Sequence, residues 1–247
     1  MNRVSQKNLF IKELEAEQFF RSITPTEEKY RILLLLVCNG TRGGEAVRLH
    51  INDFVTPDCG QFYVYNTKVA RNGKRPRRDL KILPSWIARE VRSYIKKQYE
   101  LNLLKGGYLF PTNKFMRQGH MKYDSFIAWF AEKRKKLGFT EVVDYKPAPP
   151  KLRSKGILKV PQYRISIYSF RRFMATEEAK RGTPQQFTAA RMGHLDTRTT
   201  SIYVNRQAIF EMLPQIVERS SVRFPSFAQQ RLTAFFGEKS LNSAAAT

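Results

Sequence analysis

The segment 30–37 is the feature that most constrains the fold, because it carries helix signals and is apolar on almost every side. Thr24 is expected to be its N-cap, with a proline at the first helical position and Glu27 completing a capping box. The run stops at Asn39-Gly40, a pair typical of chain reversals. Because a helix that is apolar all round must be covered by other elements, the segment is predicted to be a buried core helix.

The remaining pattern predicts a mainly α-helical fold with a small antiparallel β-sheet, an α+β class. β-Forming residues at 62–65 and 80–83 flank a turn at Asn72-Gly73 and predict a hairpin, whereas a second helical stretch starts near Thr41. Segment 144–164 has four prolines and no periodicity, so it is predicted to be a long exposed loop. Further helices are expected at 85–103, 122–137, 167–181, 184–192 and 197–203.

The charge of the chain points to a polyanionic partner. Lys and Arg number 44 against 21 Asp and Glu, a net charge of +23, which favours nucleic acid over an anionic membrane or a merely solubilised surface. Segments 68–81 and 144–164 hold seven and six basic residues, each with one Asp, so both are expected to face an anionic partner such as nucleic acid, with a solvated loop as the alternative. The predicted DNA contacts are Arg71, Lys74, Arg75, Arg77, Arg78, Lys151, Arg153, Lys155 and Arg172.

Several other classes of protein are disfavoured by what the sequence contains. Two cysteines and three scattered histidines give neither a disulfide framework nor a zinc site. A nucleotide-binding P-loop is absent, and the longest apolar run, 32–38, is far too short to cross a bilayer. No signal peptide is recognised at Met1, so a cytoplasmic, nucleoid-associated protein is expected, with no membrane partner.

Four short motifs, each weak alone, follow one another along the chain. They are Asn39-Gly40-Thr41-Arg42-Gly43-Gly44-Glu45, then Lys68 on the predicted hairpin, then Tyr168-Ser169-Phe170-Arg171, then a run from Gly193-His194 to Tyr203. In this order and spacing they resemble the TGxRxxE box, hairpin lysine, HxxR box and GHxxxxTxxxY box of the tyrosine recombinase, or phage integrase, family. The resemblance covers residues 8–215 and implies the catalytic-domain fold of that family.

The resemblance implies a reaction in which Tyr203 attacks a DNA phosphodiester and forms a 3′-phosphotyrosyl intermediate. Arg42 and Arg171 would hold the non-bridging oxygens, because planar guanidinium groups match their geometry, and His194 would donate one further hydrogen bond. Lys68 is assigned as general acid for the leaving 5′ oxygen, with Lys74 as the alternative.

Glu45, one helical turn after Arg42, would orient the arginines by ion pairing. Because the aryl ester keeps the bond energy and no carboxylate pair for magnesium accompanies these residues, neither ATP, metal ion nor any other cofactor is expected.

One position departs from the family pattern. Tyr168 stands where the HxxR box has its histidine, and a tyrosine with a pKa of about 10 is a poor base but a serviceable hydrogen-bond partner. Two alternatives to a recombinase therefore stay open. One is a nicking and closing enzyme resembling type IB topoisomerases, and the other is a DNA-binding accessory protein that has lost catalysis.

The resemblance also implies a domain organisation and an assembly. Residues 1–23 are expected to be an N-terminal helical or linker segment, 24–236 the catalytic domain, and 237–247 a disordered tail. Strand exchange in the family uses four protomers on two duplexes, so a homo-oligomer on double-stranded DNA is expected. Segment 207–236 would dock on a neighbouring protomer or pack on its own domain. Family members usually carry a preceding core-binding domain, so both a catalytic fragment and a naturally short recombinase are considered.

Overall fold

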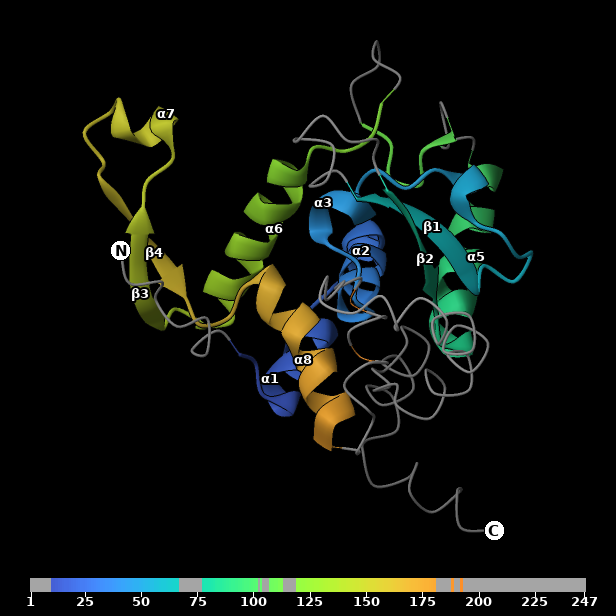
Figure 1. Ribbon diagram of the computed structural model, residues 1–247, viewed down its shortest axis with the longest axis horizontal. Helices are drawn as coiled ribbons and strands as arrows, with labels where there is room; N and C mark the ends of the chain where they lie inside the picture. The colour runs from blue at the N-terminus through green and yellow to red at the C-terminus, as the bar shows by residue number, and fades with distance from the viewer. Residues whose placement is uncertain are drawn as a thin grey trace, which may run out of the picture.

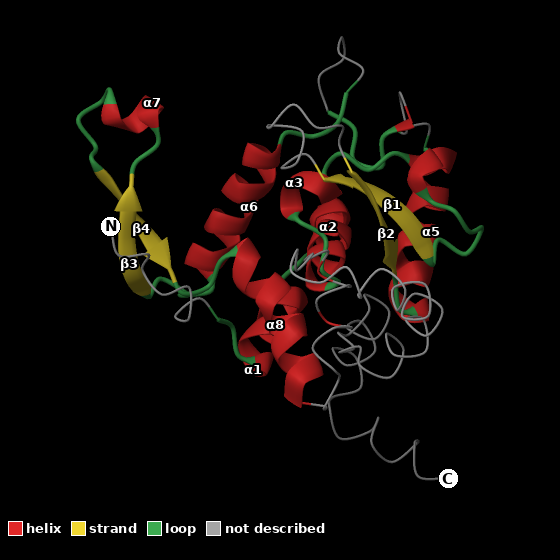
Figure 2. Cartoon of the chain, viewed as in Figure 1, coloured by secondary structure: helices red, strands yellow, loops and turns green. Residues whose placement is uncertain are grey.

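The computed structural model describes residues 10–66, 77–101, 103, 107–112, 119–180, 188 and 192 of the chain. Its helices are α1 (Glu13–Arg21), α2 (Glu28–Cys38), α3 (Gly43–Ala46), α5 (Ser85–Glu100), α6 (Tyr123–Lys136), α7 (Pro150–Arg153) and α8 (Ile167–Lys180), with 3-10 turns η2 (Pro25–Glu27) and η3 (Ile51–Asp53). Its strands are β1 (Gln61–Asn66), β2 (Arg77–Ile82), β3 (Val142–Pro147) and β4 (Lys159–Tyr163). Figures 1 and 2 show these elements as a mainly helical body with two small sheets, which confirms the α+β class.

Helix α2 lies at the centre of the body, as its sequence predicts. All eight residues from Arg31 to Cys38 are buried, and the helix packs against α3, α5 and α8 (Figure 1). Thr24 caps the preceding 3-10 turn, where its backbone N–H donates to the Glu27 carboxylate at 2.9 Å. The capping signal is therefore confirmed, although the first turn that follows it is 3-10 rather than α.

An aromatic cluster joins the first helix to elements much later in the chain. The ring of Phe19 in α1 stacks on Phe130 of α6 at 4.7 Å and meets Phe170 of α8 edge-on at 5.1 Å between centroids. Aromatic pairs in these arrangements add stabilisation beyond burial of their area. Helix α1 consequently lies in the same hydrophobic core as the helices that follow it.

The predicted basic hairpin is present as the antiparallel pair β1 and β2, which lies beside α5 on one side of the body (Figure 2). Its register places Lys81 opposite Phe62 and Asp79 opposite Val64, and all four side chains are buried. The segment as a whole is expected to face outward, but Lys81 and Asp79 do not, because side chains alternate between the two faces of a strand and these two lie on the inward face.

Segment 144–164 corrects the sequence prediction most clearly. Instead of a long loop, it forms most of a hairpin in which β3 pairs antiparallel with β4 and α7 lies at the tip. Prolines are tolerated because a two-stranded sheet has only edge strands, so a missing N–H can face away from the partner. The hairpin projects from the body beyond α6 (Figure 1), and Arg164 at its base donates to Glu15 of α1 and to Glu141.

No described helix combines the length and apolarity that crossing a bilayer requires. Among the same residues, His, Cys, Asp and Glu form no group of three or more that could hold a metal ion.

Candidate active site

The candidate site is built on the sharp turn that joins α2 to α3. Gly40 takes a φ of 87°, a left-handed conformation that glycine adopts without strain, immediately after the helix cap at Asn39. The N–H of Gly40 donates to Val37 and the N–H of Thr41 to Leu36, the hydrogen-bond pattern of a Schellman motif. The turn therefore ends the buried helix abruptly and directs the next residue, Arg42, toward solvent.

Arg42 and Glu45 form a tight pair at the start of α3. The Arg42 guanidinium donates to the Glu45 carboxylate at 2.6 Å, and the Arg42 backbone N–H donates to the same carboxylate at 3.0 Å. The Glu45 side chain is 5 % exposed and that of Arg42 is 35 % exposed, so the carboxylate lies beneath a guanidinium that solvent can reach. The ion pair that the sequence predicts between Glu45 and Arg42 is therefore present.

Gly43 has a steric reason to be glycine. A Cβ at this position would lie 2.5 Å from a ring carbon of Tyr123, the first residue of α6. The first turn of α3 can therefore pack directly against α6, which holds Arg42 in place at its N-cap.

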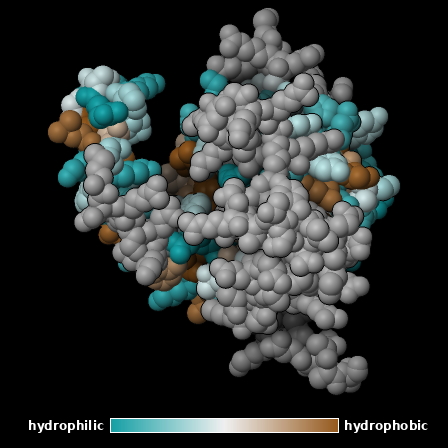
Figure 3. Space-filling model, viewed as in Figure 1, coloured by the Kyte–Doolittle hydropathy of each residue, from teal (hydrophilic) through white to brown (hydrophobic). Residues whose placement is uncertain are grey.

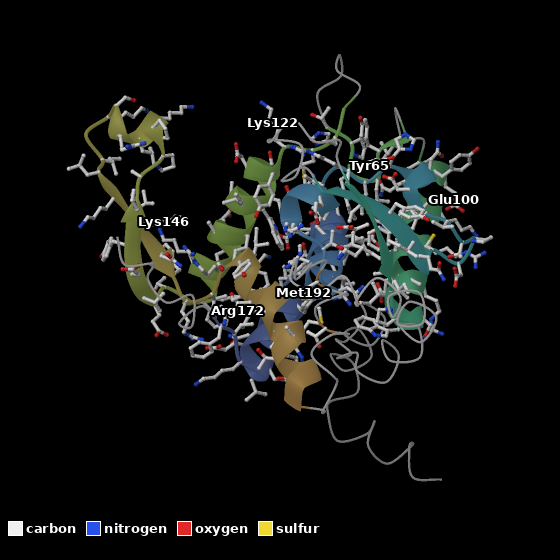
Figure 4. The ribbon with its side chains drawn as sticks, in the orientation of Figure 1. Tyr65, Glu100, Lys122, Lys146, Arg172 and Met192 are labelled. Atoms are coloured by element: carbon white, nitrogen blue, oxygen red, sulfur yellow. The ribbon has the colours of Figure 1, made fainter. Side chains whose placement is uncertain are left out.

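Arg171 reaches this turn from α8, although 131 positions separate it from Gly40. Its guanidinium is buried and donates to the Gly40 carbonyl at 2.5 Å and to the Met192 carbonyl. Met192 lies beside α8 (Figure 4), two positions before His194. Burial, reinforced by the nearby charge of Arg42, lowers the pKa of Arg171 to about 10, which leaves it charged at neutral pH.

Two buried charged residues of β2 complete the cluster, and the sequence did not assign either to it. Burial and the charge of Arg171 lower the pKa of Lys81 to about 7, against the opposing effect of the Glu45 and Asp79 carboxylates. Strand β2 is held against the turn because the Asn39 side chain donates to the Ile82 carbonyl at 2.8 Å. The signal that could have found them is the strand register. Lys81 and Asp79 pair with Phe62 and Val64, the alternate residues of β1 that face the interior.

The other predicted site residues divide into those the structure places and those it does not. Tyr168 lies one turn before Arg171 on α8 and is 40 % exposed, so it borders the cluster on the solvent side. Arg172 is on the same helix, where its carbonyl accepts from Thr176. Lys68, Arg71, Lys74, Arg75, His194 and Tyr203 lie outside the described residues, as do the side chains of Arg77 and Arg78 in β2.

The tip of the projecting hairpin carries three exposed basic residues, Lys151, Arg153 and Lys155, which we call the hairpin cations. Lys146 on β3 lies on the same projection (Figure 4). Figure 3 shows hydrophilic and hydrophobic residues together on this tip, where Leu158 is 71 % exposed. The hairpin therefore presents both cations and apolar surface at a distance from the arginine pair.

With this geometry in place, comparison with known proteins gives the family. The family model described as "Phage integrase family" matches residues 10–208, and the chain belongs to this family of tyrosine recombinases. No curated protein sequence matches the chain significantly.

Several solved structures share the fold of this chain. XerA recombinase superposes with a TM-score of 0.54 at 20 % identity, over 83 % of this chain and 64 % of its own. The integrase from mycobacterium phage Brujita superposes with a TM-score of 0.53 at 14 % identity, over 94 % of this chain and 62 % of its own. The Tn1549 transposon integrase superposes with a TM-score of 0.51 at 12 % identity, over 95 % of this chain and 67 % of its own. The chain thus spans less than two thirds of the length of XerA and of the Brujita integrase.

Proposed function

We propose that the protein is a site-specific DNA recombinase that cleaves and rejoins DNA through a 3′-phosphotyrosyl intermediate at Tyr203. The observation that carries this proposal is the convergence of Arg42 and Arg171 on one turn, from α3 and α8, with Glu45 paired to Arg42. A buried guanidinium group close to one that solvent can reach suits a tetrahedral or pentavalent phosphate, whose negative charge is spread over its outer oxygens.

In the proposed reaction the Tyr203 oxygen forms a bond to phosphorus while the bond to the 5′ oxygen breaks. Arg42 and Arg171 bind the non-bridging oxygens, and His194 donates one more hydrogen bond to them. The leaving 5′ oxygen takes its proton from Lys68, and rejoining reverses these steps without ATP. Tyr168 supports the site as a hydrogen-bond partner, in line with its exposed position beside Arg171.

The position of Met192 supports the inclusion of the fourth motif in the site. Its carbonyl accepts a hydrogen bond from Arg171, so the residue that immediately precedes Gly193-His194 is in contact with Arg171. Tyr203 follows His194 by nine positions, a separation that a short helical segment can span.

Double-stranded DNA is the proposed substrate, bound by the hairpin cations and the basic residues around the β1–β2 turn. The net charge of +23 favours a polyanion, and the Tn1549 transposon integrase was solved in complex with circular intermediate DNA. By likeness to the family, four protomers act on two duplexes, with segment 207–236 exchanged between neighbours.

A suicide-substrate assay tests the proposal. The substrates are nicked duplexes tiled across the DNA that flanks the coding gene, together with a nicked pool of random sequence. Cleavage near the nick releases a short fragment that diffuses away, so the covalent intermediate cannot rejoin and is trapped. We expect a covalent protein–DNA adduct with the wild type and with the control Tyr168→Phe, and none with Tyr203→Phe.

Two results would redirect the proposal. Duplex binding without adduct from either pool would identify a DNA-binding accessory protein instead. An adduct followed only by relaxation of supercoils, with no joining of two duplexes, would identify a nicking and closing enzyme.

A further inference from the structure

Lys81 is a buried basic residue that the proposed reaction does not use. It is 3 % exposed on β2, opposite the fully buried ring of Phe62, in a position that a strand of this kind normally fills with an apolar side chain. Placing an ammonium group there is costly unless its surroundings compensate, so the groups that face it require explanation.

Charged groups face Lys81 from three elements of the site. Arg171 approaches from α8, Arg42 and Glu45 from the start of α3, and Asp79 from β2 itself, whereas β1 contributes the apolar Phe62. The Asn39–Ile82 hydrogen bond fixes the strand against the α2–α3 turn, and the Arg171–Gly40 hydrogen bond fixes α8 against the same turn. Strand β2, which carries the buried Lys81, and helix α8, which carries Arg171, are therefore held against the same turn.

The formal charges around Lys81 depend on whether its amine carries a proton. Among the described residues that surround Lys81, two arginines and two carboxylates sum to zero, so this part of the site is neutral when Lys81 is an uncharged amine. A phosphodiester between the arginines adds one negative charge, which a protonated Lys81 then balances. A low-dielectric interior favours a net charge near zero, both without the phosphodiester and with it bound.

We infer that Lys81 is a positioning residue that binds a proton when a phosphodiester occupies the site between Arg42 and Arg171. The proton comes from solvent and forms an N–H bond on the Lys81 amine, with no change in any other covalent bond. Once charged, the ammonium group stabilises the Glu45 and Asp79 carboxylates, so the Arg42 guanidinium, which pairs with Glu45, can direct more of its donors to the phosphate. This inference rests on the proposed function.

The inference requires that Lys81 gains and loses its proton close to neutral pH. With a pKa of about 7, Lys81 changes charge close to neutral pH, and a negative charge nearby raises the pKa of a cationic group. For a rise of about one unit, the protonated fraction at about pH 7.5 goes from about a quarter to about three quarters. Binding of the phosphate should therefore take up about half a proton per protomer at that pH.

The direct test is a titration of Lys81 in the wild-type protein. The protein is labelled with ¹³C at the lysine ε carbons and followed by NMR, and the Lys81 signal is identified as the one missing from the spectrum of Lys81→Arg. The pH midpoint of that signal is measured with no ligand, with sulfate and with a short DNA duplex. We expect a midpoint near neutrality that rises by about one pH unit with either probe.

A midpoint at the ordinary lysine value, or one that stays unchanged while the Arg42 and Arg171 side-chain signals report a bound probe, would overturn the inference.

Calorimetry of duplex binding in two buffers of different ionisation enthalpy gives the functional readout. Wild type and the exposed control Lys96→Arg should take up the proton, whereas Lys81→Arg, charged throughout, and Lys81→Met should not. Equal uptake in all four proteins would also overturn the inference. The covalent-adduct assay reads the proposed function separately: an adduct without a Lys81 shift refutes only this inference, and a shift without an adduct refutes only the proposed function.

Discussion

Replacing Arg171 with lysine should destabilise the protein although the charge is kept. The guanidinium donates to two backbone carbonyls, those of Gly40 and Met192, and a lysine has a single point of charge that cannot reach both in the same geometry. Losing one charge-assisted hydrogen bond to a buried carbonyl costs about 1.5–3 kcal/mol. With a urea m-value of about 2 kcal/mol per molar, the unfolding midpoint should fall by about 1 M.

Equilibrium urea unfolding, followed by circular dichroism, measures this change. The matched control is Arg172→Lys on the same helix, for which we expect a shift within about 0.5 kcal/mol. The reasoning would be refuted if Arg171→Lys unfolded at the midpoint of the wild type, or if the two variants were equally destabilised. Either result would mean that the guanidinium does not hold α8 and Met192 against the turn.

Three further predictions concern other parts of the molecule. Despite partial burial, hydrogen bonds led by that from Lys133 lower the pKa of Glu27 to about 2, so its stabilising contribution, complete above about pH 4.5, should be lost as the pH falls toward 2. Urea unfolding at several acidic pH values should show this loss in wild type and not in Glu27→Gln. Gly43→Ala should cost about 1–3 kcal/mol because its Cβ would strike Tyr123, whereas Gly44→Ala, with open space around it, should be neutral or slightly stabilising in thermal unfolding. Neutralising the three hairpin cations with glutamine should lower the salt slope of duplex binding by about 3 without changing stability, and an unchanged slope would show that the hairpin does not touch DNA.

The buried helix and the arginine pair could be predicted from the sequence because local signals specify them. A capping box, an apolar run and Asn39-Gly40 define α2 from residues close together, and the motif order relates Arg42 to Arg171 across the whole chain. The roles of Lys68, His194 and Tyr203 stay predictions, since these residues lie outside the described part of the chain.

Two features could not be predicted because they depend on pairing between segments. The seven basic residues of segment 68–81 indicated a hairpin that faces an anionic partner, whereas the register with β1 turns Lys81 and Asp79 inward. Likewise, the prolines of segment 144–164 indicated a loop, and only the pairing of two edge strands shows why they are accommodated. Strand register is a tertiary property that composition and periodicity do not determine.

The most direct test of the central claim is to identify the residue that becomes attached to DNA. The covalent adduct is digested with nuclease and trypsin, and the nucleotide-bearing peptide is sequenced by mass spectrometry. The account predicts a nucleotide joined through its 3′ phosphate to the tryptic peptide 199–206, which contains Tyr203. Attachment to the peptide 165–171, which contains Tyr168, or attachment through a 5′ phosphate, would contradict it.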